Sequence, residues 1–237
     1  MSEARPVGVL GGTFNPIHYG HLRSAVELLD LFDFETLNLM PCAVPPHREM
    51  PGCSAEHRAA MVELATEREP RLACDPRELR REGPSYTIDS LEELRAELGS
   101  TRSLCLVMGG DAIHNIRTWH RWQELLDYCN IIVIARPGWE FPEQGEEHDW
   151  LARHRAASAR HLLEAPAGLV WLERLRPLSI SSTDAYLCDG SVCMAFMQIA
   201  SKSFLKGTSE SRVVFENLPS RICSLSFAGS LRNSAKG

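Results

Sequence analysis

Residues 6–32 read PVGVLGGTFNPIHYGHLRSAVELLDLF, and this segment by itself indicates the kind of fold. The apolar run Pro6–Leu10 predicts a short buried strand, and Gly11 and Gly12 predict a tight turn directly after it. Apolar residues then recur with helical spacing, which predicts a helix over residues 20–32. A strand, a glycine turn and an amphipathic helix in this order are typical of the start of a parallel α/β sheet.

The rest of the chain repeats this alternation. Ser54 predicts the N-cap of one helix, and Ser90 with Glu93 fits a capping box for another, whose start could also lie nearer Thr87. Further strands are predicted at 36–40, 71–74, 103–108, 130–135 and 169–172, and helices at 54–66, 119–128 and 149–164. Strands separated by helices pair in parallel through right-handed crossovers. The predicted fold class is therefore α/β, a doubly wound, mostly parallel Rossmann-like sheet with helices on both faces.

Composition excludes several classes of protein. The chain has 237 residues and a formal net charge of −6, which disfavours a dedicated nucleic-acid binder. No apolar run approaches the roughly 18 residues of a membrane-spanning helix, and the first residues lack the apolar core of a secretory signal. The eight cysteines form no C-x-x-C pair that would signal a zinc or thioredoxin-like site. We therefore expect a cytoplasmic protein with reduced thiols, no membrane partner and no bound nucleic acid.

The composition changes near the end of the chain. Residues 1–201 contain no Lys and carry 19 Arg against 29 acidic residues, whereas residues 202–237 carry six basic residues against two acidic ones. We expect a catalytic domain over residues 1–184. Residues 185–237 are expected to form a divergent segment, which could contain one helix before an irregular tail.

The loop after the first strand carries the strongest functional signal. His18 and His21 are three residues apart on the first helical turn, so both lie on one face, and Gly20 between them leaves room for a ligand. A helix N-terminus adds free N–H groups and a partial positive charge. Together these features favour a polyphosphate cradle with two imidazole donors. The alternative, one histidine capping the helix and the other lying on the surface, would be preferred for an isolated His-x-x-His pair.

Further short motifs follow in order along the chain. They are MPCAVPPHR at 40–48, SYTIDSL at 85–91, GGD at 109–111, TWHRW at 118–122, ARPG at 135–138 and SISST at 179–183. With GGTFNPIHYGHL at 11–22, this set resembles the nucleotidyltransferase superfamily with its T/HxGH signature, and more closely the bacterial nicotinate-nucleotide adenylyltransferases. The resemblance runs from about Val7 to Thr183.

The resemblance implies an activity. Members of this family transfer the adenylyl group of ATP to nicotinate mononucleotide, forming nicotinate adenine dinucleotide and pyrophosphate in NAD biosynthesis, with Mg2+ carried by ATP. The phosphate of the mononucleotide is already an anion, so the reaction needs positioning and charge stabilisation and no general base. His18 and His21 are the expected catalytic residues, neither of them as a nucleophile, and no metal-ligating protein residue is expected.

The same resemblance assigns binding residues. ATP is expected to contact Gly11, Gly12, Thr13, Phe14, Gly20, Gly109, Asp111, Ile180, Ser181, Ser182 and Thr183. The mononucleotide is expected to contact Asn15, His47, Arg48, Ser85, Tyr86, Thr87, Trp119, His120 and Arg136, with Trp119 stacked on the pyridine ring and Trp122 in the core. Thr87 could instead cap a helix, and Arg48 or Arg136 could be surface residues.

One departure from the family pattern leaves alternatives open. An Ile-Arg pair is expected one residue after Thr183, and this chain has Ala185-Tyr186 there. Two other functions therefore stay possible: a related nucleotidyltransferase with another phosphate acceptor, or a catalytically weak nucleotide-binding protein. The sequence fixes neither the oligomeric state nor the preference between nicotinate and nicotinamide mononucleotide.

Overall fold

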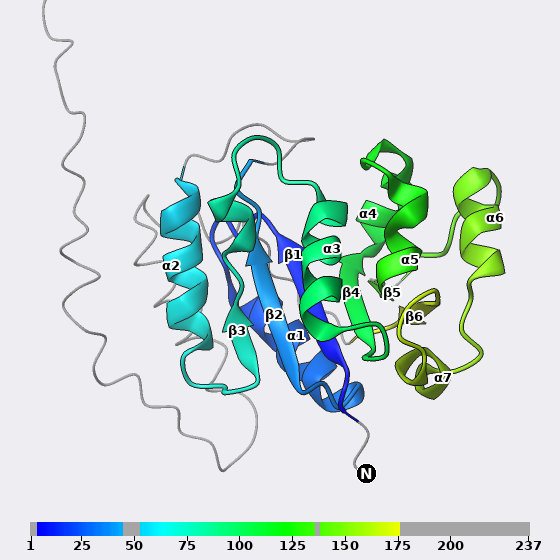
Figure 1. Cartoon of the computed structure of the whole chain (residues 1–237), viewed down its shortest axis with the longest axis horizontal. Coiled ribbons are helices and arrows are strands. Elements are labelled where there is room, and N and C mark those ends of the chain that lie inside the picture. Colours follow the sequence, from blue (N-terminus) through cyan, green and yellow to red (C-terminus); the bar gives the residue numbers. More distant parts are fainter. Residues whose placement is uncertain (1–3, 45–52, 136–137, 176–237) are drawn as a thin grey trace, which may run out of the picture.

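Six parallel strands form one sheet in the order β3-β2-β1-β4-β5-β6. The computed structural model describes residues 4–44, 53–135 and 138–175. Its strands are β1 (Val7–Gly12), β2 (Thr36–Pro41), β3 (Leu72–Cys74), β4 (Leu104–Gly109), β5 (Asn130–Ile134) and β6 (Val170–Glu173). The chain enters at the lower edge of the sheet in Figure 1, so all carboxyl ends lie at the upper edge. Strand order changes direction between β1 and β4, the place where doubly wound sheets bind ligands.

Two apolar cores, one on each face, hold the helices against the sheet. Alternate strand residues such as Val9 and Leu10 point to opposite faces and enter different cores. One face is covered by α1 (Tyr19–Leu31), α2 (Ala55–Thr66) and α7 (Ala159–Glu164), and the other by α3 (Thr87–Leu98), α4 (Gly110–His114), α5 (Leu125–Tyr128) and α6 (Glu146–Arg153). Figure 1 shows α3 in front of the central strands. The predicted doubly wound fold is therefore confirmed.

Several local predictions were wrong. The helix expected over 119–128 is a short 3-10 turn at Trp122–Glu124 followed by α5, and Trp119 itself has an extended backbone. The helix expected over 149–164 is two helices, α6 and α7, separated by a turn. Ser90 does not cap α3, because it lies inside the helix, 1% exposed, and its hydroxyl donates to Glu78. The alternative start at Thr87 is confirmed. The 3-10 turn, α5, α6 and α7 are each too short to show strong helical periodicity, so each neighbouring pair was predicted as one helix.

Arg95, near the end of α3, connects several loops at the edge of the sheet where the strands begin. Its guanidinium donates to the backbone carbonyl oxygens of Gly99, Arg102, Tyr128 and Pro166 at 2.6–2.9 Å. Arg102 and Tyr128 each lie two residues before the first residue of β4 and β5, so these bonds hold the chain where both strands start. This edge is opposite the one at which ligands bind.

None of the described helices is both long and apolar enough to cross a membrane.

Candidate active site

The loop between β1 and α1 begins later than the sequence predicts. Gly11 and Gly12 pair with β2 as the last two residues of β1, so they belong to the strand and not to a turn. A Cβ on Gly12 would lie 3.0 Å from the ring of Phe14, whereas nothing lies within 4 Å of a Cβ on Gly11. Phe14 takes a positive φ of 45° and is 3% exposed. Its ring is therefore part of the apolar core on the α1 face of the sheet.

The two histidines meet at the first turn of α1. His18 occupies the N-cap position and is 7% exposed, and His21 is the third helical residue. Their rings are stacked with centroids 3.7 Å apart and planes 27° apart, so both lie on the same side of the backbone. The rings of Phe14 and His21 are nearly perpendicular, with centroids 5.2 Å apart. The alternative interpretation is therefore half right: His18 occupies the N-cap position of α1, but neither histidine is a fully exposed surface residue.

One hydrogen bond selects the tautomer of His21. The backbone N–H of His18 donates to Nδ1 of His21 at 3.3 Å. Nδ1 therefore carries no proton, and the neutral ring holds its proton on Nε2 as a hydrogen-bond donor. Burial, followed by the neighbouring charge of His18, lowers the pKa of His21 to about 3. At neutral pH this ring is thus an uncharged donor that is already oriented.

The helix end adds to this environment. The first turn of α1 contains no acidic residue, so the partial positive charge of its N-terminus is not offset there. The loop and helix end thus place two imidazoles and the positive end of the α1 dipole at the switch point between β1 and β4. Such a surface suits an anion.

A second segment of predicted site residues lies beside the end of β2. The Ser85 hydroxyl accepts hydrogen bonds from the backbone N–H groups of Ala43 and Val44, at 3.1 and 3.2 Å. Tyr86 is the N-cap residue of α3, without a side-chain capping bond, and Thr87 is the first helical residue. The capping alternative for Thr87 is therefore wrong. Ser85 instead holds Ala43 and Val44, which follow β2.

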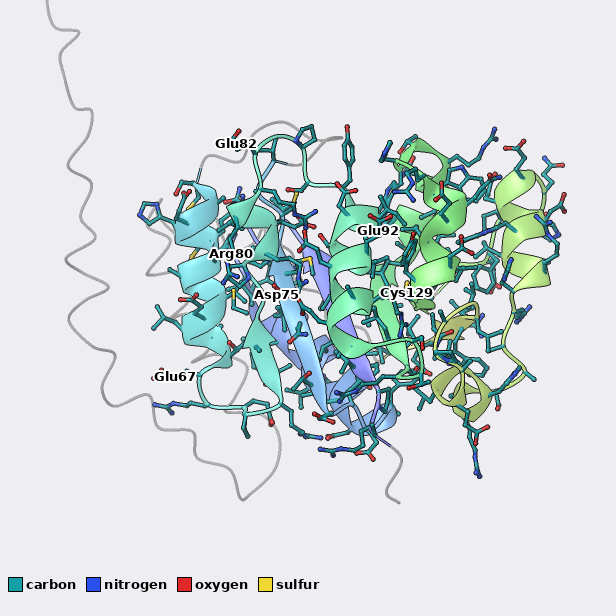
Figure 2. The ribbon with its side chains drawn as sticks, viewed as in Figure 1. Glu67, Asp75, Arg80, Glu82, Glu92 and Cys129 are labelled. Carbon is teal, nitrogen blue, oxygen red and sulfur yellow. The ribbon has the colours of Figure 1, made fainter. Side chains whose placement is uncertain are left out.

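The SYT and TWH segments come together in space. The ring centroids of Tyr86 and His120 are 4.6 Å apart, and half-buried Trp119 packs against the core, as Trp122 also does. Glu92 on α3, labelled in Figure 2, joins the two segments. It accepts from the hydroxyl of Tyr128 on α5 and from Arg121, next to His120. Trp122 contacts Trp150 edge-on at 5.2 Å. Trp122 therefore packs on a core side chain, as the sequence predicts.

The end of β4 carries the third group of predicted site residues. Gly109 is its last residue, and nothing lies within 4 Å of a Cβ placed there. At Gly110 a Cβ would come within 2.4 Å of the indole of Trp139, so only glycine fits beneath that ring. Asp111 is exposed in the first turn of α4. The packed indole therefore accounts for Gly110, whereas the space beside Gly109 is open.

Some predicted site residues fall outside the described residues: His47, Arg48, Arg136, Ile180, Ser181, Ser182 and Thr183. The departure at Ala185-Tyr186 and the segment 185–237 also fall there. Within the described residues, no group of three or more His, Cys, Asp or Glu side chains could hold a metal ion.

Sequence reasoning missed Arg58. Arg58 is 1% exposed. Its guanidinium donates to the carbonyl oxygen of Thr13, in the loop after β1, and to that of Cys42, directly after β2. An arginine on the fourth residue of a helix reads as part of a solvated face, and the apolar pattern of α2 is too weak to show which side is buried. No signal in a single sequence identifies it.

Comparison with known proteins fits this geometry. The model of the cytidylyltransferase-like family matches residues 9–185. The chain is 47% identical over 177 residues to a probable nicotinate-nucleotide adenylyltransferase of Marinomonas sp. (strain MWYL1), covering 75% of this chain and 80% of that protein. It is 48% identical over 184 residues to a protein of the same name from Hahella chejuensis, covering 77% of this chain and 84% of that one.

A solved structure supports the fold. The nicotinic acid mononucleotide adenylyltransferase of Plasmodium falciparum, complexed with NaAD, superposes with a TM-score of 0.57 at 18% identity, covering 81% of this chain and 88% of that chain. The sheet, the switch point and the family match define a nucleotidyltransferase of the cytidylyltransferase-like class. Within that class, the chain belongs to the nicotinate-nucleotide adenylyltransferase family.

Proposed function

We propose that this chain transfers the adenylyl group of ATP to nicotinate mononucleotide, releasing pyrophosphate and forming nicotinate adenine dinucleotide. The observation that carries the proposal is the stacked His18–His21 pair at the N-terminus of α1, at the switch point of a sheet of this family. Residues 1–184 would form the catalytic unit.

The reaction is a direct displacement. A phosphate oxygen of the mononucleotide attacks the α-phosphorus of ATP, the bond to the bridging oxygen of the β-phosphate breaks, and pyrophosphate leaves with that electron pair. No proton has to be removed from the attacking oxygen, so the histidines are needed neither as bases nor as nucleophiles. Catalysis then depends on alignment and on stabilising negative charge in the transition state.

The protein groups suited to that task are donors. The Nε2–H of His21 would donate to a phosphate oxygen of ATP, and the pKa near 3 means that it does so as a neutral ring. Gly11, Gly12, Thr13, Phe14 and Gly20 would contribute backbone contact, and Gly109 and Asp111 the ribose side. A ring that is already oriented costs little reorganisation during the reaction.

The metal fits as part of the substrate. Mg2+ keeps several waters and binds mainly phosphate oxygens in nucleotide sites, and the Nε2–H of His21 and the N-terminus of α1 suit the phosphates themselves. We therefore propose Mg2+ bound to ATP, where it supplies positive charge to the phosphates.

The mononucleotide would lie across the second and third segments. Ser85, Tyr86 and Thr87 at the start of α3 would meet the ring carboxylate, with Trp119 and His120 beside the ring and Asn15 on the phosphate side. Tyr86 and His120 already form one aromatic wall. His47, Arg48 and Arg136 keep their expected roles as predictions.

Replacing Trp119 by Ala is expected to raise the KM for nicotinate mononucleotide about tenfold and to leave the KM for ATP within about twofold. The reason is the loss of ring stacking, which contributes on the order of 1–3 kcal/mol for a flat base. Steady-state pyrophosphate release measures both constants. Trp122→Ala is the matched control, because Trp122 packs on Trp150: we expect lower thermal stability and an unchanged KM. A Trp119→Ala protein that loses stability and keeps its KM would assign Trp119 to the core instead.

The assay that tests the function compares acceptors. With ATP and Mg2+ present, we expect pyrophosphate release with nicotinate mononucleotide and much less with pantetheine phosphate or glycerol phosphate. Nicotinamide mononucleotide measures the preference for the ring carboxylate. Release with one of the other phosphates alone would replace this proposal by a different acceptor, and ATP binding without release would indicate a catalytically weak protein.

A further inference from the structure

A buried arginine connects the two halves of the proposed site. Arg58, on α2, is 1% exposed. Its Nη1 donates to the carbonyl oxygen of Thr13 at 2.6 Å, and its Nη2 donates to those of Cys42 at 2.7 Å and Ala43 at 3.3 Å. Its Nε donates to the carbonyl of Cys53 at 3.4 Å. One rigid guanidinium thus binds the loop after β1 and the segment after β2 at once.

The segment after β2 is also held from the other side. The Ser85 hydroxyl accepts from the N–H groups of Ala43 and Val44, and the Ser85 N–H donates to the carbonyl of Val44 at 3.1 Å. Ala43 therefore has its carbonyl bound by Arg58 and its N–H bound by Ser85. A chain of hydrogen bonds runs from Thr13, through Arg58 and Ala43, to Ser85.

We propose that Arg58 is a positioning residue that fixes the ATP half of the site relative to the mononucleotide half. This inference rests on the proposed function, which places ATP beside the loop from Thr13 to His18 and the mononucleotide beside Ser85–Thr87. In-line displacement requires the attacking oxygen and the α-phosphorus to be aligned, and a displacement of about 1 Å far from the reacting atoms can cost on the order of a hundredfold in rate. Arg58 holds that alignment without touching either substrate.

The planar geometry of the Arg58 guanidinium is what the positioning role requires. Guanidinium N–H groups point in fixed directions and can bind several carbonyls together, whereas an ammonium is a compact charge on a flexible stem. Arg58→Lys therefore keeps the positive charge and removes the geometry. A purely electrostatic role would survive this change, and a positioning role would not.

Arg95 provides a matched control for this substitution. It too binds four backbone carbonyls through its guanidinium, but at the opposite edge of the sheet. For Arg58→Lys we expect kcat to fall about tenfold or more while the KM of each substrate changes less than about threefold. For Arg95→Lys we expect a lower melting temperature and unchanged kcat and KM. Both are measured below the melting transition, with folding checked by circular dichroism.

Hydrogen exchange gives a readout that does not depend on activity. Amides of residues 13–18 and 42–44 should exchange faster in Arg58→Lys and at the wild-type rate in Arg95→Lys. Arg58→Gln, which keeps a shorter polar side chain, serves as the second variant and should show the same kinetic pattern. Equal kcat in the two lysine variants, or a loss confined to KM, overturns the proposal.

Two remaining outcomes are also decisive. If both Arg58 variants fail to fold while Arg95→Lys folds, Arg58 supports the fold as a whole and the positioning proposal is overturned. If the wild-type chain itself releases no pyrophosphate from ATP and nicotinate mononucleotide, the proposed function fails, independently of any Arg58 variant.

Discussion

His21→Ala is expected to lower kcat at least a hundredfold while changing the affinity for ATP less than about threefold. The ring is held by the His18 N–H and by its stack on His18, so its Nε2–H is aimed before substrate binds. Loss of one oriented donor to a charge that develops in the transition state typically costs about a hundred- to a thousandfold in kcat. Binding of ATP, measured by calorimetry with a non-cleavable analogue, uses many other groups and should change little.

His161 offers a matched control for this experiment. It is the third residue of α7, as His21 is of α1, and its Nδ1 likewise accepts a backbone N–H, that of Ala157 at 3.4 Å. His161→Ala removes the same kind of contact at a helix end distant from the switch point, and we expect full turnover. Near-normal turnover of His21→Ala would remove the proposed mechanism.

The second large effect is on acid stability. The pKa of His21 is about 3 in the folded protein and about 6.5 when the ring is exposed, so the unfolded chain binds more protons between these values. Stability therefore falls as the pH drops from about 6.5 toward 3, and by pH 4.5 the loss from this group is about 2.5 kcal/mol. His21→Gln should remove this contribution, because the amide oxygen can accept the His18 N–H and does not titrate.

Urea unfolding at pH 7.5 and pH 4.5 measures this difference. The free energy of unfolding should fall between the two pH values in both proteins. The fall should be about 2.5 kcal/mol smaller in His21→Gln than in the wild type. The same pair of measurements on His161→Gln should match the wild type. An identical pH dependence in all three proteins would show that His21 titrates normally and would contradict a neutral buried donor.

The fold could be predicted because its signals are local and repeated. The apolar runs at β1, β4 and β5 are short, β-branched or leucine-rich, and bounded by glycine or polar residues, and all three appear as buried strands. Ser54 caps α2 as its sequence position predicts, accepting from the N–H of His57. The crossover rule then determines the parallel sheet.

The parts that escaped prediction depend on contacts across the fold. Ser90 fits a capping box, but tertiary packing turns its hydroxyl toward Glu78. The sequence assigns Gly110 no role, whereas in the structure a Cβ at Gly110 would lie 2.4 Å from the indole of Trp139. Arg58 reads as surface, because only the folded chain brings Thr13 and Ala43 to one guanidinium.

The juxtaposition of His18 and His21 followed from their spacing, but their protonation did not. The low pKa needs burial and a neighbouring ring, and neither can be read from a three-residue interval. The sequence therefore predicted two donors and left open whether they are charged. The structure makes His21 a neutral donor with a defined tautomer.

The most direct test of the two-imidazole phosphate cradle is nitrogen-15 NMR of the histidine rings during titration with α,β-methylene ATP and Mg2+. We predict that the ring signals of His18 and His21 shift saturably with one shared dissociation constant, that His21 keeps its proton on Nε2, and that His161 does not respond. Ring signals of His18 and His21 that stay unchanged while the analogue saturates the protein would contradict the account.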